Sequence, residues 1–254
     1  MDVAAYLDRI GYSGSTEPTA ETLCRLHRAH MLTVPFENLD IALHRAILLD
    51  RDKFINKIVR ERRGGFCYEL NGAFAALLEE LGFEVTLLSA RVPRQDGSES
   101  PEFDHLTLRV DLEEPWLADV GFGDFILEPL RLRVDLEQKQ DAGVFRIREA
   151  DGDLHIEKLQ ANGEPAEQYR FTLQPRRLEE FSGMCHFHQT SPESPFTRKS
   201  LCSLATPGGR ITILERKLIE TQNGRRQERE LASDEEWKRL LRQKFGVILP
   251  NVDA

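Results

Sequence analysis

The 254-residue sequence has few of the features that mark special classes of protein. Its four cysteines form no Cys-x-x-Cys pair, which argues against a disulfide framework and favours reduced thiols. No apolar run reaches the roughly 20 residues of a membrane-spanning helix, and Met1-Asp2-Val3 begins no signal-peptide-like segment. Basic charge is not in excess: 34 Lys and Arg against 43 Asp and Glu give a net charge of −9. We therefore expect a soluble, cytoplasmic protein whose partners are neither nucleic acid nor membrane.

Residues 1–82 show the apolar spacing of helices. Gly11 and Gly82 stand where helices end, Pro35 disfavours helix at the residue before it, and Asp50 is suited to cap a helix. The apolar stripes are Val3, Leu7 and Ile10; Leu23, Leu26 and His30; Phe54, Ile55, Ile58 and Val59; and Leu70, Phe74, Leu77, Leu78 and Leu81. The sequence therefore predicts a helical N-terminal region.

After Gly82 the period changes to two. Leu106, Leu108 and Val110 alternate with polar residues, as in a half-buried strand. Asp151-Gly152 and Asn162-Gly163 are turn signals between further strand-like segments. Residues 83 to 175 are thus predicted to form a small antiparallel barrel or sandwich.

The remaining residues mix both patterns. Residues 177–188 have the pattern of a short helix, and residues 210–219 that of a strand, which is expected to turn back at Asn223-Gly224. Residues 233–236, Ser-Asp-Glu-Glu, form a capping box that predicts a final helix.

One cysteine differs from the others. Cys24 lies within a predicted amphipathic helix, and Cys185 and Cys202 lie among apolar neighbours, so all three are interpreted as small buried hydrophobes. Cys67 follows Gly64-Gly65 and directly precedes a predicted helix, whose unpaired N–H groups favour a thiolate. Two interpretations remain open from the residues alone: a nucleophile, or a buried core cysteine after a glycine turn.

A nucleophilic thiol needs a base, and the base needs an orienting group. Of seven histidines, His105 alone begins an alternating strand directly after a loop, and Asp119 is an acid within an apolar strand. A hairpin between those strands would bring the two side chains together, although spacing leaves other pairs possible. Cys185, His186 and His188 have no fourth ligand at useful spacing, so no metal site is predicted.

Several motifs together resemble the arylamine N-acetyltransferase family. Residues 63–71, Arg-Gly-Gly-Phe-Cys-Tyr-Glu-Leu-Asn, are similar to its active-site signature, and residues 34–39, Val-Pro-Phe-Glu-Asn-Leu, to its N-terminal motif. His105-Leu106 and residues 119–123, Asp-Val-Gly-Phe-Gly, resemble its histidine and aspartate motifs, in the same order. Residues 189–204 resemble a further segment, so the similarity covers nearly the whole chain. The length resembles that of prokaryotic members, without the long tail and insertion of vertebrate ones.

The resemblance implies an α+β fold with a cysteine-protease-like Cys-His-Asp core. A helical bundle, residues 1–82, would carry the nucleophile, and a β-barrel, residues 83–188, the histidine and aspartate. An α/β lid would follow in residues 189–254. The implied catalytic residues are Cys67, His105 and Asp119.

The implied reaction moves an acetyl group from acetyl-CoA, the co-substrate, to the nitrogen of an arylamine or arylhydrazine. It is a ping-pong reaction through an acetyl-cysteine, without a metal. By resemblance, the acceptor would be bound by Phe36, Val92, Asp104 and Phe122. Acetyl-CoA would be bound by Pro101, Glu102, Phe187, Thr190, Ser191 and Glu193.

Other functions are compatible with the same triad. A cysteine hydrolase would pass the acyl group to water, and an amide synthase of natural-product biosynthesis would pass it to a larger acceptor. A ligand-binding module would require an inert Cys67. Phe122 has a similar alternative, as a core aromatic in a glycine-rich turn.

Overall fold

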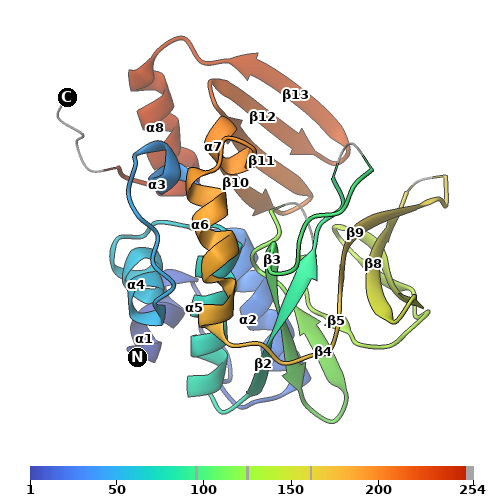
Figure 1. Cartoon of the computed structure of the whole chain (residues 1–254). Coiled ribbons are helices and arrows are strands. Elements are labelled where there is room, and N and C mark those ends of the chain that lie inside the picture. The colour runs from blue at the N-terminus through green and yellow to red at the C-terminus, as the bar shows by residue number, and fades with distance from the viewer. Residues whose placement is uncertain (95–96, 124–125, 161, 250–254) are drawn as a thin grey trace.

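The computed structural model describes residues 1–94, 97–123, 126–160 and 162–249. Helices lie on one side of the molecule, a barrel-like sheet on the other, and a second sheet with the last helix across one end (Figure 1). The helices are α1 (Val3–Arg9), α2 (Ala20–Thr33), α3 (Leu39–Ala42), α4 (Arg51–Ile55), the π-helix η1 (Asn56–Arg60), α5 (Cys67–Glu80), the 3-10 helix η2 (Leu178–Phe181), α6 (Ser182–Thr190), α7 (Pro195–Arg198) and α8 (Asp234–Phe245).

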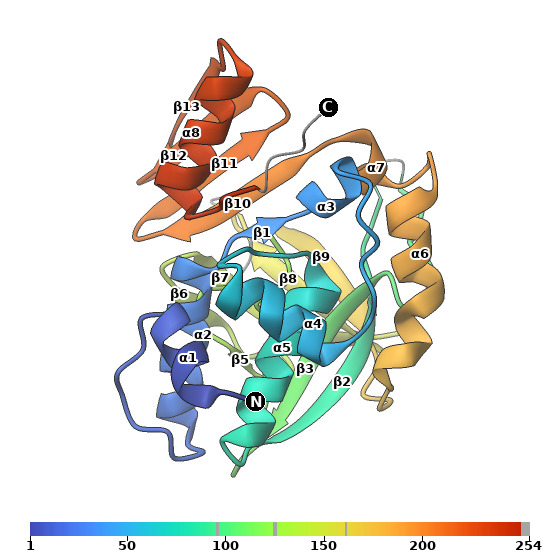
Figure 2. The same ribbon diagram turned by 90° about the vertical axis from the view of Figure 1, so that its left-hand side faces the viewer.

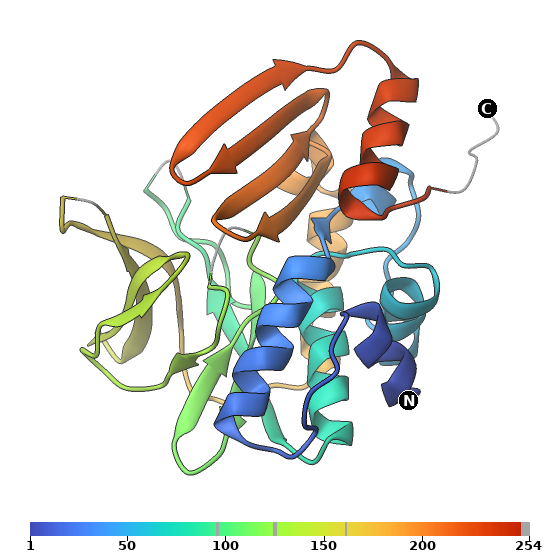
Figure 3. The same cartoon turned by 180° about the vertical axis from the view of Figure 1, so that it is seen from behind.

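The predicted helix boundaries are largely confirmed. Asp50 caps α4 by accepting the N–H groups of Asp52 and Lys53, and Gly11 and Gly82 take positive φ values of 65° and 87° after α1 and α5. α5 is the central helix, lying beside α2 in the view from behind (Figure 3) and buried along most of its length. The segment after α4 continues as the π-helix η1, which the apolar spacing did not distinguish from an α-helix.

Eight antiparallel strands form the larger sheet, in the order β5-β4-β3-β2-β9-β8-β7-β6. Its edges approach each other: the Gln138 side chain, on β6, accepts the backbone N–H of Arg131, on β5, and donates to its carbonyl. The sheet is therefore nearly closed, so of the two predicted alternatives, a barrel or a sandwich, the barrel is found. Its strands are β2 (Glu84–Arg91), β3 (His105–Asp111), β4 (Pro115–Ala118), β5 (Leu130–Arg131), β6 (Gln138–Gln140), β7 (Gly143–Ala150), β8 (Asp153–Leu159) and β9 (Pro165–Phe171).

The second sheet has five strands in the order β1-β10-β11-β12-β13, and α8 packs against it (Figure 2). Its first strand comes from the N-terminal region, because Phe36 pairs with Ser203 across the β1–β10 ladder. The strands are β1 (Phe36–Glu37), β10 (Leu201–Thr206), β11 (Gly209–Leu214), β12 (Lys217–Gln222) and β13 (Arg225–Glu230).

One strand prediction for this sheet is wrong. Residues 210–219 were expected to be a single strand, but they span β11 and β12, which pair through Leu214 and Lys217 around a two-residue turn. Glu215 adopts the left-handed conformation there, with φ 52°. The turn contains no Gly, Pro, Asn or Asp, so the sequence carried no turn signal.

Three apolar clusters hold these layers together. The largest joins the helices to one face of β2, β3 and β4; a second fills the barrel; the third lies between the five-stranded sheet and α8. No helix within the described residues is both long enough and apolar enough to cross a bilayer.

Candidate active site

Cys67 is the first residue of α5 and follows a turn that only glycines allow. A Cβ atom on Gly64 would lie 1.9 Å from the Pro35 carbonyl oxygen. The two backbone segments are close enough to hydrogen-bond, and the Glu37 N–H donates to the Gly65 carbonyl at 2.8 Å. The two glycines therefore bring β1 against the turn that carries the cysteine.

The thiol of Cys67 is buried, with 4% of the residue exposed. Burial, and secondarily the Asp104 and Asp119 carboxylates, raise its pKa well above the usual value, and the Leu106 backbone N–H, which hydrogen-bonds to the thiol, opposes them only in part. Cys67 thus lies at a helix start, as predicted, but burial raises the pKa of its thiol by more than the favourable interactions lower it. A positive charge near the sulfur favours the thiolate, and the imidazole of His105 gains such a charge when it takes a proton.

His105 and Asp119 are brought together by the predicted hairpin. β3 begins at His105, β4 ends at Ala118, and the two strands pair antiparallel with Leu108 opposite Ala118. The Nε2 of His105 lies 2.6 Å from Oδ2 of Asp119. Because the carboxylate accepts, Nε2 carries the hydrogen, and Nδ1 is the basic nitrogen of the neutral ring.

The Asp119 carboxylate is fully buried and accepts three further hydrogen bonds. Tyr169 donates its hydroxyl at 2.8 Å, Asn71 its amide at 2.9 Å, and Gly121 its backbone N–H at 2.9 Å. Burial alone would raise the pKa of this carboxyl, but His105 and the hydrogen bonds from Asn71 and Gly121 bring it below the usual value. Asp119 therefore stays ionised and can stabilise a protonated His105.

A second histidine fixes the backbone at this point. The Asp119 N–H donates to Nε2 of His27 at 3.1 Å, and Nδ1 of His27 lies 2.9 Å from the Leu127 carbonyl oxygen. Burial lowers the pKa of His27 to about 4, so the ring is neutral and Nδ1 carries its hydrogen. His27, Asn71 and Tyr169 had no predicted role, and their distance from Asp119 along the chain leaves no spacing signal.

The four predicted acceptor-binding residues lie on different segments of the chain. The half-buried ring of Phe122 lies 5.1 Å from that of His105, and Val92 packs in the same barrel cluster as Phe122. Phe36 bridges to Gly65 in the cysteine turn, and Asp104 directly precedes His105. Of the four, Phe122 is in contact with His105, and the acceptor-binding role of all four stays a prediction.

The predicted coenzyme-binding residues form two groups. Pro101 and Glu102 lie in the loop before β3, where Glu102 is ion-paired with Arg176. The others lie at the end of α6 and in the turn after it: Phe187, Thr190, Ser191 and Glu193. His188 links this second group to the centre, because its Nε2 lies 3.3 Å from Oδ1 of Asp104. Cys185, His186 and His188 form no metal centre, and no other metal-binding group was found within the described ranges.

A cavity of about 530 Å³ lies between the barrel and the five-stranded sheet. Gly123, which follows Phe122 in the chain, and Ser203, which pairs with Phe36 across the β1–β10 ladder, are among the residues that line it. Among the described residues of its lining, three are basic, Lys158, Arg210 and Arg226, and one is acidic, Asp141.

Comparison with known proteins places the chain in a family. The family model for N-acetyltransferases matches residues 19–254. The chain is 37% identical to the arylamine N-acetyltransferase pineal gland isozyme NAT-3 of Gallus gallus, over 98% of this chain and 95% of that one. It is 35% identical to the arylamine N-acetyltransferase of Escherichia coli, over 95% and 87% of the two chains.

Solved structures agree with these relatives. The arylamine N-acetyltransferase of Salmonella typhimurium superimposes with a TM-score of 0.92 at 32% identity, covering 99% of this chain and 93% of that one. The Mycobacterium marinum enzyme in complex with CoA gives 0.90 at 30% identity, covering 97% and 93%. The chain therefore belongs to the arylamine N-acetyltransferase family, whose members are acetyl-CoA-dependent acyltransferases. The family and the cysteine-protease-like fold expected from the sequence are confirmed.

Proposed function

We propose that the protein transfers an acetyl group from acetyl-CoA to the nitrogen of an arylamine or arylhydrazine through an acetyl-Cys67 intermediate. The observation that carries this proposal is a buried thiol at the start of α5, the helix whose Asn71 donates to Asp119, together with a histidine whose Nε2 is held at 2.6 Å by that same buried carboxylate. That arrangement supplies a nucleophile, a base and an orienting group.

The first half-reaction begins when Nδ1 of His105 takes the thiol proton. The sulfur of Cys67 attacks the thioester carbonyl, the bond to the coenzyme sulfur breaks, and CoA leaves with the proton from His105. Asp119, held ionised by its four donors, stabilises the imidazolium between the two proton transfers.

The second half-reaction runs in the opposite sense. The acceptor nitrogen attacks the acetyl carbonyl on Cys67, His105 removes a proton from that nitrogen, and the thiol is regenerated. The amine must reach the acetyl group past Phe122, whose ring stands edge-on to His105 at an interplanar angle of 74°. A flat aromatic acceptor can stack or pack against such a ring.

The charge of the cavity of about 530 Å³ between the barrel and the five-stranded sheet supports a polyanionic co-substrate. CoA carries phosphates, and three cationic side chains, those of Lys158, Arg210 and Arg226, line this cavity of an otherwise acidic protein. The group formed by Phe187, Thr190, Ser191 and Glu193 lies on α6 and after it, and we keep it as a second candidate contact for the coenzyme.

Withholding the acceptor tests this proposal. With acetyl-CoA alone, intact-mass analysis should show one acetyl group per chain, located on Cys67, because a ping-pong transferase accumulates its intermediate. Addition of an arylamine or arylhydrazine should then remove the group and yield the N-acetyl product.

Each alternative function predicts a different result in this experiment. Rapid CoA release without an adduct would indicate a hydrolase. An adduct that arylamines and hydrazines cannot discharge would indicate an amide synthase with another acceptor. A Cys67 that is neither acetylated nor more reactive than Cys24, Cys185 and Cys202 would indicate a binding module and contradict the proposal.

Phe122→Ser should separate the two half-reactions. We expect the apparent KM for arylamines to rise about fivefold, since a lost aromatic contact is worth roughly 1 kcal/mol, while Cys67 acetylation changes little. The half-reactions are measured separately, by CoA release in a single turnover and by discharge of the acetyl-enzyme. Leu132→Ser, a partly buried change in the same barrel cluster, is the control. Equal losses in both half-reactions would make Phe122 a structural residue.

A further inference from the structure

A buried cluster of five charged side chains contacts the cysteine turn. Lys57, on η1, lies 2.8 Å from Glu69 and 2.7 Å from Asp40. Arg63, which begins the turn, lies 2.7 Å from Glu37 and 3.0 Å from Asp40. The cluster therefore contacts the turn at both ends, at Arg63 before the glycines and at Glu69 after Cys67.

Glu69 has the most direct connection to the cysteine. Its Oε2 accepts the backbone N–H of Phe66, the residue before Cys67, at 3.1 Å, while its Oε1 accepts from Lys57. The side chain folds back over Gly65, where a Cβ atom would lie 2.7 Å from that same Oε2. Phe66 has no side-chain acceptor of its own, so Glu69 provides the cap that α5 otherwise lacks.

We propose that Glu69 is a positioning residue for Cys67, and that its two-sided hydrogen bonding to the Phe66 N–H and to Lys57 holds the nucleophile where His105 can deprotonate it. This inference rests on the proposed role of Cys67. Glu69 does not touch the reacting atoms. It acts through the backbone immediately before them.

Only a carboxylate satisfies both donors at once. A glutamine can accept from Phe66 or from Lys57, but its NH₂ group must then face the other donor. If Lys57 is replaced by methionine, that conflict disappears and glutamine can cap Phe66 alone. The pair therefore allows a rescue experiment that a general loss of stability would not reproduce.

The cluster also has an excess of one negative charge. Lys57 and Arg63 face three carboxylates, those of Glu37, Asp40 and Glu69. Asp40 contacts both cations, which together lower its pKa despite its burial, whereas burial raises the pKa of Glu69 to about 7. The other titratable group facing Glu69 is the thiol of Cys185 on α6, whose pKa its charge helps to raise.

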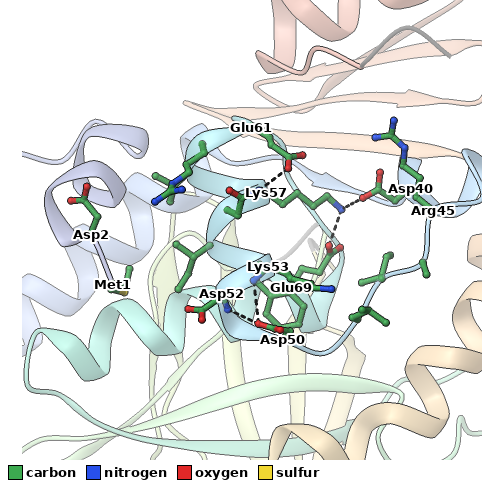
Figure 4. A pocket seen from close by; sticks show the side chains of 18 of the residues that line it. Met1, Asp2, Asp40, Arg45, Asp50, Asp52, Lys53, Lys57, Glu61 and Glu69 are labelled. Carbon is green, nitrogen blue, oxygen red and sulfur yellow. Dashed lines mark hydrogen bonds and ion pairs between the residues drawn. The ribbon is translucent and has the colours of Figure 1, made fainter. Parts of the chain in front are cut away.

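Solvent can exchange protons with this pair. Lys57 and Glu69 form part of the wall of a cavity of about 760 Å³. Figure 4 shows Lys57 pointing between Asp40 and Glu69, with Asp50, Asp52 and Glu61 around the same cavity. Protonation of Glu69 removes an acceptor from one of its two donors, so the positioned turn is favoured as the pH rises through about 7.

The experiment compares Glu69→Gln, Lys57→Met and the double variant with the wild-type chain. The rate of Cys67 acetylation by acetyl-CoA in a single turnover, and of its alkylation by iodoacetamide, is measured from pH 5.5 to 9. In the wild-type chain both rates should rise as the pH passes through about 7, because Glu69 then becomes ionised. We expect Glu69→Gln to slow both rates by about ten- to a hundredfold, with the KM for acetyl-CoA unchanged, and to abolish this rise. The double variant should regain a rate within about threefold of wild type while still lacking that rise.

Glu61→Gln is the matched control, because Glu61 lines the same cavity but bonds to Asn56 and not to Phe66. It should keep both the wild-type rate and the rise near pH 7. If Glu69→Gln does not fold, the double variant decides: a folded, fast enzyme without the pH 7 rise supports the inference.

Wild-type rates and an unchanged pH profile in Glu69→Gln would overturn the positioning role and leave the proposed function intact. A double variant as slow as Glu69→Gln would also overturn it, because the loss would then not depend on the two-sided hydrogen bond. A wild-type Cys67 that is never acetylated would instead overturn the proposed function, and this inference with it.

Discussion

Cys67→Ala is expected to abolish acetyl transfer, with a loss of at least about 10⁴-fold, because removal of the nucleophile leaves only the binding groups. No acetyl-enzyme should form with acetyl-CoA, as measured by intact mass and by the absence of a burst of CoA release. Alanine is well tolerated in a helix, so the melting temperature should change by only a few degrees.

Cys185→Ala is the matched control for this variant. Cys185 is also a buried thiol, on α6, but its sulfur lies 3.2 Å from the Gln189 amide and has no place in the proposed reaction. The Cys185→Ala variant should still form the acetyl-enzyme and should transfer the acetyl group at the wild-type rate. A folded Cys67→Ala enzyme with near-native turnover would move the nucleophile elsewhere in the chain.

Asp119→Asn is expected to cost about 10³- to 10⁴-fold in both half-reactions while leaving the fold in place. Four donors converge on the carboxylate, from His105, Tyr169, Asn71 and Gly121. An asparagine amide accepts through one oxygen only, so its NH₂ group must face a donor. When it faces Nε2 of His105, the ring hydrogen moves to Nδ1, and that nitrogen can no longer take the thiol proton.

The measurement is the alkylation rate of Cys67 against pH, beside the single-turnover acetylation rate. Both should fall together in Asp119→Asn, whereas Asp111→Asn, a carboxamide change at the other end of β3, should leave both unchanged. Asp111 is ion-paired with Arg109 at the protein surface and is distant from His105 along the strand. Near-native rates in Asp119→Asn would place the orienting group elsewhere.

Sequence patterns predicted what is local. The helix after Gly64-Gly65, the strand that begins at His105 and the hairpin that leads to Asp119 each depend on a short segment, and each is found in the structure. The expected reaction, acetyl transfer from acetyl-CoA, was predicted from the resemblance of residues 63–71 and the other motifs to the family. The division of the chain at residues 82 and 188 and the roles of the three candidate catalytic residues stay predictions.

What the sequence did not reveal is the set of contacts that join distant segments. Asn71, Tyr169 and His27 bond to Asp119 from other elements, and no periodicity connects residues so far apart. The charges of Lys57 and Glu69 have the appearance of an exposed helical face, yet the fold buries both. Burial of ionisable groups is decided by packing, which pattern analysis does not see.

The pairing of β1 with β10 has a consequence for the order in which the chain becomes active. The ribosome makes Cys67 early, together with the helix that presents it. The strand behind its turn, Phe36–Glu37, obtains its other neighbour only when Cys202 and Ser203 have been synthesised. Asn38 is likewise held by the Phe196 and Lys199 carbonyls. A nascent chain that stops before this segment therefore has the cysteine turn and its helix, but the strand behind that turn still lacks its second neighbour.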